Sequence, residues 1–168
     1  PKATWGISNT FRWKGFDLYF LIQGVSGLDV FNGDGYYTES KKFNRNYVKD
    51  RWISAEYPGD GRTPTVGSAG ISWEFTDYMI EDGSFVALRD VVLGYTFDKK
   101  KLKKAGLNSL RLYASGQNLL YFWGKSYRGI NPEARVTTGS YSSPLVNGYQ
   151  RGGFPIQSTV NIGFELNF

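Results

Sequence analysis

The chain has 168 residues, a net charge of +5 and an aromatic content of 17%, and it contains neither cysteine nor histidine. The lack of cysteine excludes disulfide bridges, thiolate metal sites and cysteine nucleophiles. The lack of histidine excludes histidine zinc sites and serine–histidine triads. These absences lower the expectation of catalysis, and we expect no enzymatic activity, catalytic residue or cofactor, and no metal site of these kinds. No stretch approaches the roughly 18 apolar residues of a membrane helix, but a membrane-spanning β-strand needs only about 10 alternating residues.

Two segments near the start alternate between apolar and polar residues, which predicts β-strands at 3–14 and 16–25. Only Lys14 and Gly15 separate the two apolar patterns, and so short a link is typical of a tight hairpin. One face of the pair is expected to carry Trp5, Ile7, Phe11, Trp13, Phe16, Leu18, Phe20 and Ile22.

Three further strands are predicted at 85–97, 109–122 and 156–168. The last alternates up to the final residue. In 85–97 the parity is mixed: Leu93, Tyr95 and Phe97 share a face with Arg89, whereas Val86, Leu88 and Val92 share one with Asp90. Either a β-bulge or a change of environment along the strand explains this change.

Short and long links alternate along the chain. The hairpin link and the lysine-rich turn 98–108 are short, while the polar segments 26–84 and 123–155 are long. Both long links therefore leave from the same ends of the strands, as in outer-membrane barrels with short periplasmic turns and long extracellular loops. Five aromatic residues fall beside the short links, where an interfacial girdle is expected: Trp13, Phe16, Tyr95, Phe97 and Phe168. The sequence thus predicts an all-β fold, an antiparallel transmembrane β-barrel, in preference to a soluble β-domain.

The strands and loops also carry recognisable motifs in order. They are Leu-Gly-Tyr-Thr at 93–96, Arg-Leu-Tyr-Ala-Ser-Gly-Gln-Asn-Leu at 111–119, Tyr-Arg-Gly-Ile-Asn-Pro-Glu at 127–133 and Gly-Phe-Pro at 153–155. This series resembles the late barrel region of SusC/RagA-type TonB-dependent outer-membrane transporters. The resemblance covers most of 85–168 and, more loosely, 4–20. Ala87 and Asp90 are mild departures from the family pattern.

The resemblance implies that the chain is the C-terminal part of a barrel of roughly 22 strands in the bacterial outer membrane. About five strands cannot close a barrel, which needs at least about 8, so the rest is expected from a longer polypeptide or from separately contributed strands. The implied function is import of large nutrients, glycan or peptide, with a SusD-like surface lipoprotein and the TonB system as partners, the latter through a missing N-terminal part. The alternatives are an outer-membrane scaffold that anchors a surface assembly without import, and a soluble carbohydrate-binding domain.

Residues of the long loops are candidates for contact with a substrate or partner, because aromatic rings with polar tips suit such surfaces. They are Tyr36, Tyr37, Trp52, Trp73, Tyr127, Arg128, Asn131, Glu133, Tyr141 and Tyr149. Packing of the loops against each other or a partner lipoprotein is the equal alternative. The residues expected to face the lumen are Arg12, Asp17, Tyr19, Arg111, Tyr113 and Gln117. For these, contact with a plug is favoured over contact with a substrate, because the lumen of a large barrel must be filled.

The end of the last strand has an expected second role. Phe164, Leu166 and Phe168 resemble the aromatic C-terminal signal that the barrel-assembly machinery reads. The same strand must also pair with the first strand of the barrel, because an open sheet edge is not tolerated in lipid. We expect outer-membrane lipid to cover the apolar faces.

Charged residues of the links suggest no further chemistry. The lysine cluster is expected to be solvated and attracted to anionic lipid headgroups, rather than to bind nucleic acid; its members are Lys99, Lys100, Lys101, Lys103 and Lys104. The segment 29–40 superficially suggests a calcium loop but has Phe31 at the third position, against the EF-hand pattern. A looser oxygen-ligand site there stays open. Solvated or hydrogen-bonded loop carboxylates are expected at Asp77, Glu81, Asp82 and Glu133.

Overall fold

The computed structural model describes residues 1–33, 49–63, 65, 77–103, 106–134, 148–150 and 153–168. These residues divide into two compact units, which we treat separately. The strand unit comprises 1–26, 85–123 and 156–168, and the loop unit comprises 27–84 and 124–155. None of the described helices is both long and apolar enough to cross a membrane.

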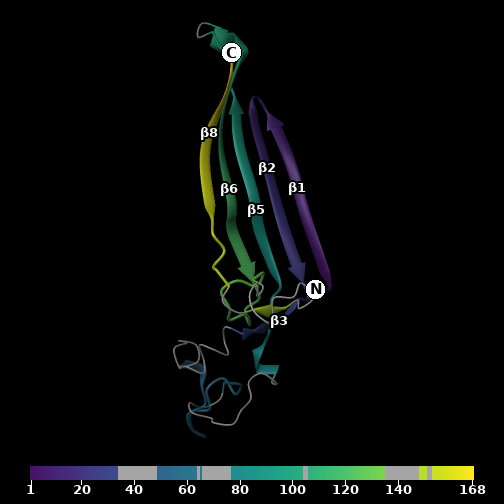
Figure 1. Ribbon diagram of the computed structural model, residues 1–168, viewed down its shortest axis with the longest axis vertical. Helices are drawn as coiled ribbons and strands as arrows, with labels where there is room; N and C mark the ends of the chain where they lie inside the picture. Colours follow the sequence, from purple (N-terminus) through teal and green to yellow (C-terminus); the bar gives the residue numbers. More distant parts are fainter. Residues whose placement is uncertain (34–48, 64, 66–76, 104–105, 135–147, 151–152) are drawn as a thin grey trace. The chain divides into compact units, whose positions relative to one another are not determined.

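The strand unit is an antiparallel sheet of five strands in the order β1-β2-β5-β6-β8 (Figure 1). This arrangement confirms the all-β antiparallel fold. The strands are β1 (Ala3–Trp13), β2 (Phe16–Ser26), β5 (Phe85–Thr96), β6 (Ser109–Trp123) and β8 (Thr159–Asn167). The last strand begins at Thr159, three residues later than the alternation predicts. β1 and β8 form the two edges, so each needs a neighbour from outside this sheet before the sheet can close.

Both short links have the local chemistry of tight connections. Lys14 and Gly15 have φ angles of 45° and 91°, the two positive values that a type I′ hairpin turn requires. The link between β5 and β6 contains one helical turn, α3 (Lys99–Leu102). The carboxylate of Asp98 accepts a hydrogen bond of 2.9 Å from the backbone N–H of Lys100 and so caps this turn.

A β-bulge at Arg89 explains the change of parity in β5. Leu21 pairs with Asp90 whereas Ile22 pairs with Leu88, so Arg89 is the additional residue. On the other side of β5 the register shifts at the same point, and Asn118 of β6 has a φ of 49°. The bulge returns the apolar residues on either side of it to one face of the sheet.

Paired residues lie on the same face of an antiparallel sheet, and the registers therefore define one continuous apolar face. Its large apolar residues are Trp5, Ile7, Phe11, Trp13, Phe16, Leu18, Phe20, Ile22, Val86, Leu88, Val91, Leu93, Tyr95, Leu110, Leu112, Leu120, Phe122, Val160, Ile162, Phe164 and Leu166. Asn9 is a polar residue on this face. The face is open rather than packed, since Ile162 is 87% exposed and Trp13 is 67% exposed. The opposite face is called the polar face; its polar residues include Arg12, Asp17, Tyr19, Gln23, Arg89, Asp90, Arg111, Tyr113, Gln117, Asn161 and Glu165.

The loop unit contains a small sheet of its own. β3 (Asp29–Asn32) pairs with β4 (Ile80–Asp82) in antiparallel fashion and with β7 (Tyr149–Gln150) in parallel fashion. A short 3₁₀ turn, η2 (Asp77–Met79), leads into β4. The alternation of the sequence predicts none of these strands, because two to four residues are too few to display a period of two. The core of this unit includes the buried side chains of Val30 and Met79.

Candidate functional site

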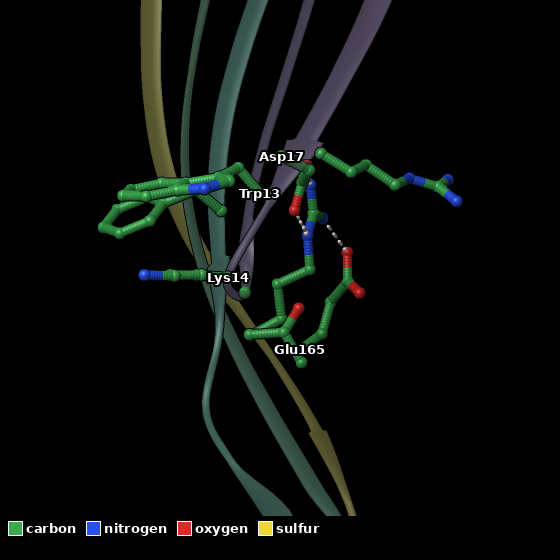
Figure 2. A pocket seen from close by; sticks show the side chains of 9 residues that line it. Trp13, Lys14, Asp17 and Glu165 are labelled. Carbon is green, nitrogen blue, oxygen red and sulfur yellow. Dashed lines mark hydrogen bonds and ion pairs between the residues drawn. The ribbon is translucent and has the colours of Figure 1, made fainter.

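An ion network crosses the polar face near the β1–β2 hairpin (Figure 2). Arg111 of β6 donates from Nε and Nη2 to the two carboxylate oxygens of Asp17 in β2, at 3.1 and 2.7 Å. Its Nη1 donates to Oε1 of Glu165 in β8 at 2.9 Å. The register explains this reach, since Arg111 is paired directly with Glu165. One guanidinium thus ties three strands together in the bidentate geometry that favours arginine over lysine.

Two glycines make room for long polar side chains on this face. Gly94 lies in β5, the strand between Asp17 and Arg111, and a Cβ there would come within 2.5 Å of Asp17 Oδ1 and 2.6 Å of Arg111 Nη2. A Cβ at Gly163 of β8 would come within 2.5 Å of the Tyr113 ring. Both glycines therefore allow long polar side chains to lie flat across the neighbouring strand.

The network borders a pocket of about 560 Å³. Its lining comprises Arg12, Trp13, Lys14, Gly15, Phe16, Asp17, Thr96, Arg111 and Glu165. Three basic residues, Arg12, Lys14 and Arg111, and two acidic residues line it, and both acids already accept hydrogen bonds from Arg111. Such a surface offers polar recognition and rigidity, not acid–base chemistry, because its carboxylates are ion-paired to a permanently charged base.

A second polar cluster surrounds the bulge. Arg89 donates from Nε to Gln23 Oε1 at 2.8 Å and from Nη1 to Asn118 Oδ1 at 3.1 Å. Its guanidinium lies 5.3 Å from the ring centroid of Phe85 and 5.8 Å from that of Tyr121. Arg89 is absent from the residues that the sequence assigns to the polar face. Arg89 reaches the polar face because of the bulge, and the change of parity in 85–97 was the one feature of the sequence that indicated this.

The loop unit is organised around a buried carboxylate. Glu81 is 4% exposed and accepts hydrogen bonds from the backbone N–H and Nε of Arg128, each at 2.7 Å. Asn32 Nδ2 lies 3.1 Å from both carboxylate oxygens. Arg128 also donates from Nη2 to the Tyr78 carbonyl at 2.7 Å, and its guanidinium lies 4.3 Å from the Tyr78 ring. A buried charge needs this degree of pairing to be tolerated.

The motif at 127–133 forms a second part of the same framework. Tyr127 is 6% exposed, and its hydroxyl donates to Gln150 Oε1 at 2.6 Å. The Gln150 amide donates to the Pro132 carbonyl at 2.6 Å, and the Asn131 backbone N–H lies 3.2 Å from the Tyr127 hydroxyl. In the described structure, Tyr127 and Arg128 form hydrogen bonds within the loop unit, and Arg128 also lines the pocket described next.

A smaller pocket of about 320 Å³ lies within the loop unit, lined by Asp50, Asp60, Arg62, Tyr78, Ile80, Glu81, Lys125, Ser126 and Arg128. Burial raises the pKa of Asp60, but hydrogen bonds from Thr63 and Arg62 and the charge of Arg128 outweigh it and leave the pKa below its usual value. The Asp60 carboxylate accepts from the backbone N–H of Thr63 at 2.6 Å and from its hydroxyl at 2.8 Å. Asp60 is thus a fixed anion that closes a turn.

The remaining candidates from the sequence occupy varied positions. Trp52 is 44% exposed, and Tyr149 stacks on Phe31 with ring centroids 5.5 Å apart. Glu133 is exposed, and its backbone N–H donates to Asn131 Oδ1 at 2.9 Å. The candidates that lie outside the described residues are Tyr36, Tyr37, Trp73 and Tyr141.

Two other expectations concern the chain ends and metals. Phe164 and Leu166 lie on the apolar face of the edge strand β8, and Phe168 follows it with 80% exposure. The possible oxygen-ligand loop 29–40 lies outside the described residues from position 34 onward. Within the described ranges, no group of three or more acidic side chains is arranged to hold a metal ion.

Comparison with known proteins places this geometry in context. No protein-family model matches the chain. It is 32% identical over 171 residues to TonB-dependent receptor P3 of Formosa agariphila, covering all of this chain and 16% of that protein. It is 25% identical over 169 residues to TonB-dependent receptor SusC of Bacteroides thetaiotaomicron, covering 97% of this chain and 15% of that protein. The chain therefore spans about one sixth of the length of these relatives.

The fold is shared with a solved transporter. The structure of the RagAB peptide transporter superposes with a TM-score of 0.70 at 21% identity, over 97% of this chain and 17% of that one. The 'open-open' state of the RagAB peptide importer gives a TM-score of 0.67 at 21% identity, over 98% of this chain and 17% of that one. The motifs and the similarity to TonB-dependent receptors along the whole of this chain agree with the shared antiparallel sheet, and the chain belongs to the SusC/RagA-type TonB-dependent family.

Proposed function

We propose that this chain is a wall segment of a nutrient importer in the bacterial outer membrane, with its apolar face toward lipid and its polar face toward the lumen. The observation that carries this proposal is the apolar face, which stays exposed across all five strands. Exposure of so much apolar surface to water is unfavourable in proportion to its area, and lipid contact removes that cost. The polar face, with its paired charges, suits a lumen.

The dimensions of the apolar face support the same orientation. Trp5 and Trp13 lie at opposite ends of β1 on that face, and eight residues at about 3.4 Å each separate them by about 27 Å along the strand. With a strand tilt of about 40°, this spans about 21 Å, close to the apolar band of about 25 Å in outer-membrane barrels. Aromatic residues at both ends match the two interfacial girdles.

The links suggest which end faces which compartment. The hairpin turn and the α3 link are short, and the two long links both leave from the opposite strand ends. We assign the short links to the periplasm and the long links to the cell exterior, as in barrels of this kind. The remaining strands of a roughly 22-stranded barrel, a plug and a TonB-contacting segment would come from the rest of the polypeptide.

The proposed cargo is a large nutrient, a glycan or a peptide, captured together with a SusD-like surface lipoprotein. The fold shared with the RagAB peptide importer supports peptide as one cargo class. This segment would contribute no covalent chemistry. It would supply barrel wall, polar lumen surface and loops, including the pocket bordered by Arg62 and Lys125.

The decisive experiment uses the full-length protein in its native cell. A strain lacking the gene is grown with peptides or complex glycans as the sole carbon source. The complemented strain and a strain depleted of TonB are grown beside it. If the protein is an importer, one nutrient class should no longer support growth of the deletion strain or of the TonB-depleted strain. Complementation should restore growth of the deletion strain on that class. Unchanged growth on every class, together with loss of a surface lipoprotein from the deletion strain, would instead establish the scaffold alternative.

A further inference from the structure

Exposed lysines of two separate links lie at the same end of the five-stranded sheet. Lys14 belongs to the β1–β2 hairpin, and the α3 link contributes Lys99, Lys100 and Lys103. The backbone N–H of Thr96 donates to the Gly15 carbonyl at 2.8 Å, so the hairpin lies directly beside the start of that link. We call these four residues, Lys14, Lys99, Lys100 and Lys103, the lysine rim.

The direction of Lys14 relates the rim to the apolar face. Its ammonium group lies 4.9 Å from the centroid of the Trp13 ring, and Trp13 is 67% exposed on the apolar face. Figure 2 shows Lys14 and Trp13 on one side of the strands and the Asp17 and Glu165 carboxylates on the other. The Lys14 charge is therefore directed away from the ion network and lies at the border of the apolar face.

The backbone supplies an independent argument. Lys14 has a φ of 45°, a region in which lysine is strained and in which asparagine, aspartate or glycine would suit the turn better. Turn formation alone therefore does not account for a lysine at this position. At the other link, the Asp98 carboxylate caps the backbone N–H of Lys100. The side chains of Lys99, Lys100 and Lys103 are exposed there.

We propose that the lysine rim binds the headgroups of anionic phospholipids at the edge of the membrane. This inference rests on the proposed function, because it requires the apolar face to contact lipid. Tryptophan at the interface sits at headgroup level, and an ammonium group beside it donates up to three hydrogen bonds to phosphate oxygens. Basic residues near an anionic surface each add to binding. The charge and its continuity with the apolar face thus select a lipid surface over a soluble acidic partner.

The test measures lipid binding to the purified full-length protein in a neutral detergent. Dioleoylphosphatidylglycerol and dioleoylphosphatidylethanolamine are titrated separately, and bound lipids are counted by native mass spectrometry. The wild type should prefer phosphatidylglycerol. The double variant Lys99→Gln/Lys103→Gln should bind it about fivefold more weakly for each lysine removed at low salt. The matched control Lys2→Gln/Lys49→Gln changes two exposed lysines outside the rim and should bind as the wild type does.

A second variant separates lipid binding from folding. Lys14→Asn places a residue suited to positive φ in the turn, so the unfolding midpoint should stay equal or rise while phosphatidylglycerol binding falls. Equal binding of the two lipids by the wild type, or no loss in the rim variants, would overturn the inference. Outer-membrane insertion and nutrient-dependent growth are measured on the same proteins. If the wild type inserts and supports growth normally but shows no lipid preference, only the lipid-binding role of the lysine rim is rejected. If the wild type is absent from the membrane, the proposed function is rejected.

Discussion

Asp17 and Arg111 form a bidentate ion pair across an intervening strand, and the pair passes over Gly94. The carboxylate comes from β2 and the guanidinium from β6, with β5 between them. Cross-strand contacts normally join neighbouring strands. Here the absence of a side chain at Gly94 lets the pair join second neighbours, so three residues far apart in sequence form one structural feature.

The first prediction concerns this glycine. Gly94→Ala should lower the free energy of unfolding by about 1–3 kcal/mol, because its Cβ would displace both members of the ion pair. The control is Gly6→Ala in β1, where the nearest atom to a Cβ is the Ile22 carbonyl oxygen at 3.8 Å. Urea unfolding of the full-length protein, followed by heat-modifiable gel mobility, measures both. Equal stability of the two variants would show that the ion pair adapts without cost.

The second prediction concerns the arginine. Arg111→Lys should destabilise the sheet by about 1–2 kcal/mol, because one ammonium group cannot reproduce the two-pronged contact with Asp17 and also reach Glu165. Arg12→Lys is the matched control: Arg12 lies on the same face but makes no side-chain hydrogen bond within the described residues. The same unfolding assay applies. If Arg12→Lys lowered the stability as much as Arg111→Lys, a role for bidentate geometry would be contradicted.

The sequence predicts the five long strands because one face of each is apolar over many residues, as β8 shows up to Leu166. It cannot locate the bulge, because either Arg89 or a neighbour could be the additional residue, and only the pairing with β2 and β6 decides. The sequence does not predict the small sheet of the loop unit either, for a different reason. Its parallel pair joins Phe31 to Tyr149, a contact between distant segments with no periodicity to reveal it.

The alternation of the sequence places residues of the ion network on one face of the sheet, but it does not reveal which of them bind each other. Arg111 and Asp17 fall on the polar face by alternation alone, and their pairing depends on the register and on a missing side chain at Gly94. In the loops, Tyr127 and Arg128 stand out as amphipathic residues, but the sequence does not reveal that Glu81 is buried against them. A single carboxylate in a polar segment looks the same whether solvent or an arginine surrounds it.

The third prediction concerns that buried carboxylate. Glu81→Gln should destabilise the loop unit by about 3 kcal/mol, because it leaves the Arg128 guanidinium without its anionic partner in a partly buried position. Hydrogen exchange of the full-length protein should then accelerate at the backbone N–H of Arg128, which donates to Glu81. Glu133→Gln, at an exposed carboxylate, should leave exchange unchanged. Unaltered protection in the Glu81 variant would mean that Asn32 and the backbone suffice.

The fourth prediction concerns pH. Because the folded-state pKa of Asp60 lies below its usual value, its contribution to stability is complete above the unfolded-state pKa and is lost as pH falls through the lower, folded-state pKa. Protection of the Thr63 backbone N–H, which donates to Asp60, should therefore persist at pH 5 and decline below about pH 4. Asp60→Asn should remove this acid step, while Asp29→Asn, at an exposed position, should keep it. An unchanged step in the Asp60 variant would assign it to another carboxylate.

The last prediction concerns the terminal aromatic residue. Phe168 follows β8 and is 80% exposed, so deleting it removes little packing from the sheet. If the residue serves recognition by the barrel-assembly machinery, its deletion should lower the amount of full-length protein in the outer membrane several-fold. The unfolding midpoint of the protein that does insert should stay the same. Phe154→Ala removes a similarly exposed phenylalanine of the loop unit, 84% exposed, and should leave the amount unchanged. A fall in the unfolding midpoint on deletion of Phe168 would instead assign the residue a packing role in the closed barrel.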